Sequence, residues 1–169
     1  VNQTCEEQQL LHRSQHPRLL SKVFETASEK EAVRSELLMA IAKQESRFSP
    51  GVSSPVGAIG LLQLMPATAE ELAGGALTSA ELREPTRNAR LGARYLAQLL
   101  EQWQGNIVLA IASYNAGPGA ASQWVTPALE KDPELWVERI PYPETRLYTK
   151  KVLGNLWAYL GSGHDRCDS

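Results

Sequence analysis

The apolar residues of this chain recur at helical spacing, and this pattern restricts the fold more than any other feature. Apolar side chains at i, i+3 or i+4, and i+7 are typical of amphipathic helices. Five segments carry such stripes, namely 19–27, 33–42, 91–103, 107–114 and 147–159. No segment shows the alternation of apolar and polar residues that is typical of a half-buried strand. The sequence therefore predicts a mainly α fold.

Prolines and glycines mark the ends of the predicted helices, and no linker divides the chain. Pro85 suits the first turn of one helix, and Gly105 and Gly117 follow the ends of two others. The segment 1–16, which is charged and rich in glutamine, either packs as an extra helix or forms a tail. The chain has 169 residues, and a domain typically has about 150. We therefore expect residues 1–169 to form a single domain.

Charge and composition argue against several classes of protein. The formal net charge is −2, which disfavours a nucleic-acid binder that depends on bulk positive charge. The apolar runs are short, for example 107–112, whereas a membrane-spanning helix needs about 20 apolar residues. The sequence has no Gly-rich phosphate loop and no HExxH motif, and its histidines lie outside any ligand-like cluster. We therefore expect no nucleic acid, no membrane span, no metal and no cofactor.

The two cysteines, Cys5 and Cys167, lie near opposite ends of the chain. They either form a bridge that ties the termini together in an oxidising compartment or remain two unpaired thiols. A bridge that closes so long a loop would stabilise the fold by roughly 4–5 kcal/mol in the chain-entropy model. Because the chain begins at Val1 rather than Met, we expect a processed or truncated product whose targeting segment is not in view.

Glu45 is the carboxylate that the pattern sets apart from the others. It continues the apolar stripe of Leu37, Leu38 and Ile41, so its side chain faces the predicted core, where an unpaired carboxylate is rare. It also lies near the C-terminal end of its predicted helix. Desolvation and the negative end of the helix dipole both favour the protonated carboxyl, and a general acid must be protonated near neutral pH. The pattern alone leaves two readings, a catalytic acid or a buried glutamate satisfied by hydrogen bonds.

Tyr114 is a second candidate for the same site. It ends one apolar stripe and is followed directly by 115–119, a segment with two glycines and a proline. At the mouth of the core its hydroxyl can donate to a carboxylate or to a sugar oxygen; the alternative is a core tyrosine with a bonded tip. Small residues in 57–60 and 117–119 leave room for a wide ligand to approach the backbone.

Several stretches, in this order and at these spacings, resemble the lytic transglycosylases with a goose-lysozyme-like catalytic domain, glycoside hydrolase family 23. The resemblance is to the branch of the soluble lytic transglycosylases (SLT) and covers about 17–159. The matching stretches are 40–46, 54–69, 88–92, 95–96, 112–119 and 138–148. It implies a lysozyme-like helical bundle with a substrate groove, in which 53–63 can form a small β-hairpin. One departure is Glu84, where the family usually has Asp or Asn.

The resemblance also implies a role for each matching residue. Glu45 corresponds to the catalytic acid/base, and Tyr148 to a tyrosine near the same site. Tyr114 and Asn115 correspond to the pair that positions the acid and the sugar. Glu138 corresponds to a second acidic residue, which binds sugar or peptide and is not a nucleophile. Three further residues are implied to line the groove near the scissile bond: Ser54, Gln63 and Met65.

The implied activity is non-hydrolytic cleavage of the β-1,4 bond between N-acetylmuramic acid and N-acetylglucosamine in peptidoglycan strands. Most glycosidases use two carboxyls, but a single acid suffices where the substrate's own acetamido group assists. The product then ends in a 1,6-anhydro sugar. We accordingly expect a monomer in the periplasm or cell envelope whose partner is the glycan strand.

Two alternatives remain open at this point. A goose-type lysozyme would use the same fold with water as the acceptor, and Glu138 keeps this hydrolytic alternative open. A non-catalytic peptidoglycan-binding module would keep the fold and tolerate loss of Glu45. The end of the product, anhydro or reducing, distinguishes the first alternative, and clearing of purified cell walls distinguishes the second.

Overall fold

The computed structural model describes residues 4–161, and most of them are helical, as the periodicity predicts. The helices, in chain order, are α1 (Cys5–Gln15), α2 (Ser21–Glu31), α3 (Ser35–Ser46), α4 (Pro66–Ala73), α5 (Ser79–Arg83), α6 (Pro85–Gln102), α7 (Ile107–Ala116), α8 (Pro118–Ser122), α9 (Ala128–Lys131), α10 (Pro133–Glu138) and α11 (Pro143–Gly161). None of the helices within residues 4–161 combines the length and the hydropathy that a membrane span needs. Cys5 opens α1, and Cys167 lies outside the described residues, so the bridge between them stays a prediction.

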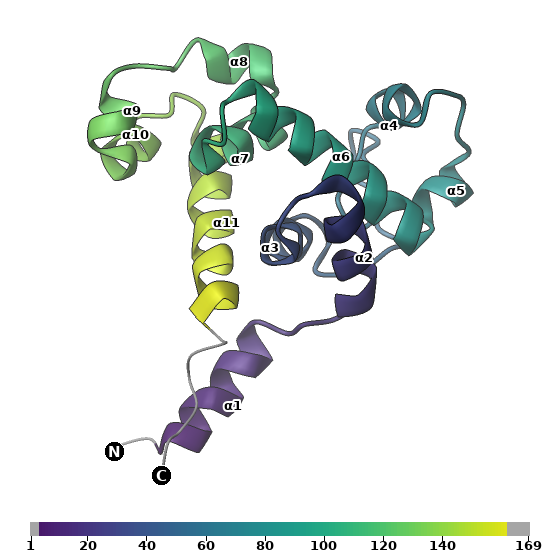
Figure 1. Cartoon of the computed structure of the whole chain (residues 1–169), viewed down its shortest axis with the longest axis horizontal. Coiled ribbons are helices and arrows are strands. Elements are labelled where there is room, and N and C mark those ends of the chain that lie inside the picture. Colours follow the sequence, from purple (N-terminus) through teal and green to yellow (C-terminus); the bar gives the residue numbers. More distant parts are fainter. Residues whose placement is uncertain (1–3, 162–169) are drawn as a thin grey trace.

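Helix α3 runs through the middle of the molecule (Figure 1). It contacts α2, α6 and α11, and every residue from Leu37 to Ala42 is buried. A helix that is apolar on all sides requires such a position, because each face needs a partner. The C-terminal turn of α3 reaches the edge of this core and carries Glu45 there.

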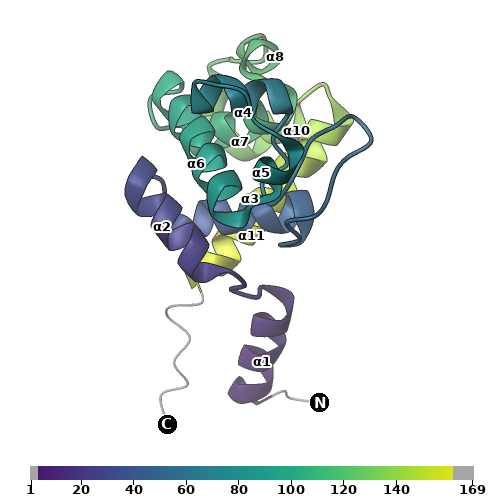
Figure 2. The same cartoon turned by 90° about the vertical axis from the view of Figure 1, so that its right-hand side faces the viewer.

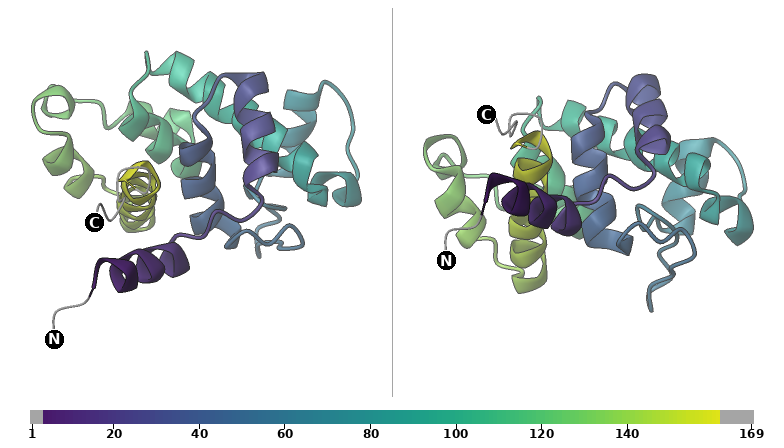
Figure 3. Two further views of the ribbon diagram at one scale, coloured as in Figure 1. Left: turned by 60° about the horizontal axis from the view of Figure 1, so that its bottom comes forward. Right: turned by 90° about the horizontal axis from the view of Figure 1, so that it is seen from below.

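The N-terminal segment forms a helix rather than a tail. Helix α1 begins with a capping box, in which Thr4 and Glu7 satisfy each other's backbone N–H groups. No residue of α1 is buried, and the helix projects from the body of the molecule (Figure 2). The connection to α2 passes the end of α11 (Figure 3), where the hydroxyl of Tyr159 donates to the carbonyl of Pro17 at 3.0 Å.

The segment 53–63 does not form a regular β-hairpin. Within residues 4–161, the only bridges recorded there are the isolated antiparallel pairs Ser53 with Ile59 and Ile59 with Leu64. Side chains from the surrounding helices hydrogen-bond the backbone of this loop, as a partner strand would in a hairpin. Ser46 donates to the carbonyl of Leu61 at 2.8 Å, so this carbonyl of the loop is paired, as buried backbone groups generally are.

Asn88 is the main anchor of the same loop. It is fully buried, and it accepts from the backbone N–H of Leu62 at 2.8 Å and donates to the carbonyls of Ile59 and Leu82 at 2.9 and 2.8 Å. Gly60 lies against it with φ +84°, and a Cβ there would lie 2.3 Å from the amide nitrogen of Asn88. Glycine therefore allows the loop to approach α6 closely.

The departure from the family pattern at Glu84 leaves the start of α6 intact. The Glu84 carboxylate accepts from the backbone N–H groups of Thr86 and Arg87 at 2.9 and 2.7 Å. A carboxylate at this position satisfies unpaired N–H groups of the first turn and interacts favourably with the helix dipole.

Candidate active site

Glu45 is held by a tyrosine from the neighbouring helix. The hydroxyl of Tyr148, on α11, donates to Oε1 of Glu45 at 2.8 Å. The glutamate is half-buried, and burial raises the pKa of its carboxyl to about 7 even though the Tyr148 hydrogen bond favours the ionised form. Desolvation penalises the charge more than one hydrogen bond stabilises it. Near neutral pH a large fraction of the molecules therefore carry a protonated Glu45.

The two oxygens of this carboxyl differ in their surroundings. Tyr148 is only 5% exposed, and burial together with the nearby Glu45 holds its pKa well above the usual value, so it remains a hydroxyl donor. Oε1 therefore accepts the hydrogen bond from Tyr148. No group within residues 4–161 hydrogen-bonds Oε2, so Oε2 is the oxygen left to carry and transfer the proton.

A second carboxylate acts on Glu45 through its charge. Glu144 lies in the first turn of α11, one turn before Tyr148, and is exposed. Its negative charge adds to the rise in the pKa of Glu45, because two neighbouring carboxylates resist being ionised together. Sequence reasoning assigned Glu144 no role, although its i, i+4 spacing from Tyr148 was the available signal.

Tyr114 serves the loop rather than hydrogen-bonding Glu45. Its hydroxyl donates to the carbonyl of Leu62 at 2.8 Å, and its ring packs against Tyr95 with centroids 5.3 Å apart. Burial and the charge of Glu45 both raise its pKa, so the two residues are close enough to interact electrostatically. The hydrogen bond expected from Tyr114 to a carboxylate is instead made by Tyr148, because the backbone carbonyl of the loop takes the Tyr114 proton.

Asn115 and Met65 occupy helix ends near this loop. Oδ1 of Asn115, near the end of α7, accepts from Thr145 of α11 at 2.7 Å, which ties the last turn of α7 to the first of α11. Met65 precedes α4 and is 44% exposed. Both positions leave polar or apolar atoms available to a ligand, and the sugar-binding roles implied for them stay predictions.

Ser54 and Gln63 use their polar atoms to shape the loop. The hydroxyl of Ser54 accepts from the N–H of Ala58 at 3.0 Å. The amide of Gln63 donates to the carbonyls of Gly60 and Val52 at 2.9 and 3.2 Å. Their implied groove-lining role stays a prediction.

Glu138 ends α10 on the surface, where Lys150 of α11 pairs with it. The ammonium group of Lys150 lowers the pKa of the Glu138 carboxyl, so this carboxylate stays ionised. Its implied part in binding sugar or peptide stays a prediction. Within the described residues 4–161, no group of three or more His, Cys, Asp or Glu side chains is placed to hold a metal ion.

The raised pKa of Glu45 predicts how stability changes with pH. Its usual pKa is 4.5 and its folded value about 7, so between these values the folded protein binds a proton that the unfolded chain does not. Stability therefore falls as pH rises through this window, and Glu45→Gln removes the loss. Between pH 4 and pH 8, the free energy of unfolding of the variant should rise by about 3 kcal/mol relative to that of the wild type. Urea unfolding at both pH values measures this gain, and an unchanged difference would contradict it.

The fold and the site together define a helical domain with one protonatable glutamate at the end of its central helix. Residues 22–137 match the Transglycosylase SLT domain, and the chain belongs to this family. It is 36% identical over 143 residues to the soluble lytic murein transglycosylase of Escherichia coli K12, covering 81% of this chain and 22% of that protein.

Solved structures of lytic transglycosylases share the fold. The lytic transglycosylase Slt of Pseudomonas aeruginosa, solved as an inactive mutant with a glutamate changed to glutamine, has a TM-score of 0.82 and 38% identity, covering 89% of this chain and 25% of that one. The 70-kDa soluble lytic transglycosylase of E. coli has a TM-score of 0.78 and 34% identity, covering 88% and 25%. The predicted mainly α, lysozyme-like fold is thus confirmed, and the chain spans about a quarter of these proteins' length.

Proposed function

We propose that this chain is the catalytic part of a peptidoglycan lytic transglycosylase. The substrate is the β-1,4 bond between N-acetylmuramic acid and N-acetylglucosamine, and the product ends in a 1,6-anhydro sugar. One observation carries the proposal, the carboxyl of Glu45 with a pKa of about 7 and one oxygen free of hydrogen bonds within the described residues. A carboxyl of this kind is available both as an acid and as a base near neutral pH.

The first step uses the protonated form of Glu45. Oε2 gives its proton to the glycosidic oxygen, and the bond from that oxygen to C1 of the N-acetylmuramic acid breaks. The acetamido oxygen of the same sugar bonds to C1 and takes up the developing positive charge, as in other substrate-assisted glycosidases. Tyr148 stabilises the carboxylate that this step creates, because its hydrogen bond strengthens when Oε1 becomes charged.

The second step uses the ionised form. Glu45 removes the proton from the C6 hydroxyl of the same sugar, and the C6 oxygen bonds to C1 while the acetamido oxygen leaves. Glu45 is protonated again, and no water is consumed. The C6 hydroxyl competes well with water because it belongs to the same molecule, an advantage worth several kcal/mol.

The relatives support this proposal by what they do. The E. coli relative is a soluble lytic murein transglycosylase, and the P. aeruginosa enzyme is inactive with one glutamate changed to glutamine. Loss of activity on changing one glutamate in that enzyme is compatible with a mechanism that depends on one carboxyl. Since relatives include soluble and membrane-bound murein transglycosylases, we propose the periplasm or cell envelope as the location. We also propose a monomer as the working form.

Hydrolysis is the second candidate, and Glu144 is the observation that favours it. Its charge acts on Glu45, so a water molecule near Glu45 has a second carboxylate within electrostatic range. Glu138 fits this task less well, because Lys150 pairs with it. A non-catalytic peptidoglycan-binding module, in contrast, does not require a carboxyl with a raised pKa.

Mass spectrometry of the products from digested peptidoglycan tests the proposal. A lytic transglycosylase releases 1,6-anhydro ends, and a goose-type lysozyme releases reducing ends that are heavier by one water. A binding module releases neither. Glu144→Gln separates the routes further, since it should lower a water-dependent product more than the anhydro product, even though it also changes the charge beside Glu45.

The hydrogen bond from Tyr148 predicts a shift in the pH dependence of the reaction. Tyr148→Phe removes a contact that favours ionised Glu45, so the pKa of Glu45 should rise by about one pH unit. The alkaline limb of the pH–rate profile should move up by the same amount, and the maximum rate should fall about tenfold or more. Tyr142→Phe, on the exposed connector before α11, is the matched control. An alkaline limb at the wild-type position would contradict the prediction.

A further inference from the structure

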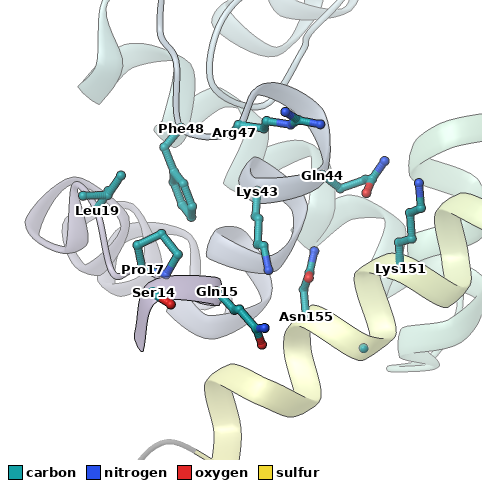
Figure 4. Close-up of a pocket in the computed structure, with 11 residues that line it drawn as sticks. Ser14, Gln15, Pro17, Leu19, Lys43, Gln44, Arg47, Phe48, Lys151 and Asn155 are labelled. Atoms are coloured by element: carbon teal, nitrogen blue, oxygen red, sulfur yellow. The ribbon is translucent and has the colours of Figure 1, made fainter. Parts of the chain in front are cut away.

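A cavity of about 480 Å³ lies between α1, α3 and α11. Its lining includes three cations, namely Lys43 and Arg47 at the end of α3 and Lys151 on α11, and it contains no aspartate or glutamate. Figure 4 shows the Lys43 side chain between Gln15 and Asn155. The residues of the candidate active site are not part of this lining, so the cavity is a separate feature of the molecule.

The three cations of this cavity have no acidic partner in the described part of the chain. Within residues 4–161 none of the recorded ion pairs involves one of them. A second cavity, of about 460 Å³, offers the contrast, because its arginines at 87, 90 and 94 each pair with Glu81 or Glu31. The protein therefore balances the positive charge of one cavity with its own carboxylates and leaves that of the other without them.

Part of this positive charge is removed from water. Lys43 is half-buried, and burial lowers the pKa of its ammonium group, because desolvation disfavours the charged form. On α1, burial and then the charges of Lys43 and His12 lower the pKa of His16, whose Nδ1 is buried without a hydrogen-bond partner in residues 4–161. An anion beside Lys43 would offset this cost, since hydrogen bonds between charged groups are stronger than those between neutral ones.

The size and the lining of the cavity indicate what kind of anion it fits. Sites for small molecules typically measure about 300–1,000 Å³ and combine apolar walls with a few polar groups. Phe48, Leu19 and Pro17 provide apolar wall here, and Gln44 provides an amide donor. One carboxylate has too little charge to balance three cations, whereas a phosphate monoester carries roughly −1.5 to −2 near neutral pH and has three strong acceptor oxygens.

We propose that this cavity binds a phosphate monoester, with the phosphate among Lys43, Arg47 and Lys151 and the organic group against Phe48. The guanidinium group donates two parallel hydrogen bonds to the phosphate oxygens, and each ammonium group adds a charged donor. The ester is either a small soluble molecule, such as a glycerol or sugar phosphate, or the headgroup of phosphatidate in a membrane. Both sources present the same group to the three cations.

Isothermal titration of the 169-residue chain at constant ionic strength tests the proposal. The probes are glycerol 3-phosphate, acetate and uncharged glycerol. Glycerol 3-phosphate should bind at least about tenfold more tightly than acetate, because it bonds more than one cation, and glycerol should bind most weakly. Arg47→Gln and Lys151→Gln should each weaken the binding of glycerol 3-phosphate about tenfold. Arg90→Gln is the matched control, since that arginine lines the second cavity and pairs with Glu31, and it should leave the affinity unchanged.

Sedimentation with lipid vesicles distinguishes the two sources of the phosphate group. One set of vesicles contains phosphatidylcholine alone, and the other also contains phosphatidate. Binding to the phosphatidate vesicles that is lost in Arg47→Gln would support the proposal with a lipid headgroup as the ligand. Binding of glycerol 3-phosphate without binding to either set of vesicles would support it with a soluble ester.

Two results would overturn the proposal. The first is that glycerol 3-phosphate binds no more tightly than acetate. The second is that Arg47→Gln and Lys151→Gln both keep the affinity of the wild type. If Arg47→Gln then lowers the melting temperature, Arg47 only stabilises the C-terminal end of α3, where a cation interacts favourably with the helix dipole.

Discussion

Glu45→Gln is expected to lower the release of anhydro sugar from peptidoglycan by about three orders of magnitude or more, the range of general acid–base catalysis. The amide has nearly the shape of the carboxyl and keeps an oxygen to accept from Tyr148. It has no acidic proton for the leaving oxygen and no basic oxygen for the C6 hydroxyl. Both steps therefore fail while the surroundings persist.

The rate of this variant is best measured on purified glycan strands, with the products identified by mass. Glu101→Gln, an exposed glutamate on α6, makes the same chemical change away from the site and should turn over at the wild-type rate. Binding of glycan strands should survive in the Glu45 variant, which shows that it is folded. Turnover close to the wild-type rate would remove Glu45 from the mechanism.

Asn88→Ala is expected to destabilise the fold by roughly 3–5 kcal/mol, because each unsatisfied buried group costs about 1–3 kcal/mol. The truncation leaves an N–H at Leu62 and carbonyls at Ile59 and Leu82 without their partner. These groups belong to or flank the loop that carries Gln63, so this loop should loosen before the helices do.

Urea unfolding measures this loss, and Asn106→Ala is the matched control. Asn106 caps α7 by accepting from the N–H of Leu109 at 3.0 Å, and loss of such a cap costs about 1 kcal/mol. An equal decrease in the free energy of unfolding of the two variants would contradict the prediction, since the buried hydrogen bonds of Asn88 would then stabilise the fold no more than one helix cap does.

The helical architecture follows from the sequence to a large extent. The apolar stripe from Val33 to Ala42 predicts a helix with a wide buried face, and α3 has that face against α2, α6 and α11. Local spacing is sufficient here because a helix is specified by residues three and four apart. The hairpin expected at 53–63 is the opposite case. Backbone groups of Leu61 and Leu62 in that loop are bonded by Ser46, Asn88 and Tyr114, which lie elsewhere in the chain.

The candidate site divides in the same way. The position of Glu45 at the end of an apolar stripe predicts a desolvated carboxyl, and its pKa of about 7 agrees with that. The helical spacing did not predict which residue donates a hydrogen bond to this carboxyl. Tyr148 and Tyr114 both end near Glu45, and only the packing of α11 on α3 decides that Tyr148 donates to it. The effect of the Glu144 charge on Glu45 likewise depends on distant segments meeting.

The sequence by itself determined the helices, the desolvated position of Glu45 and the family motifs, because each depends on residues close together in the chain. Only the tertiary structure decided which hydroxyl meets that glutamate and which oxygen is left for the proton. Hydrogen bonds and charges act over a few ångströms in space, and residues 103 positions apart, such as Glu45 and Tyr148, come within 2.8 Å only when the helices pack.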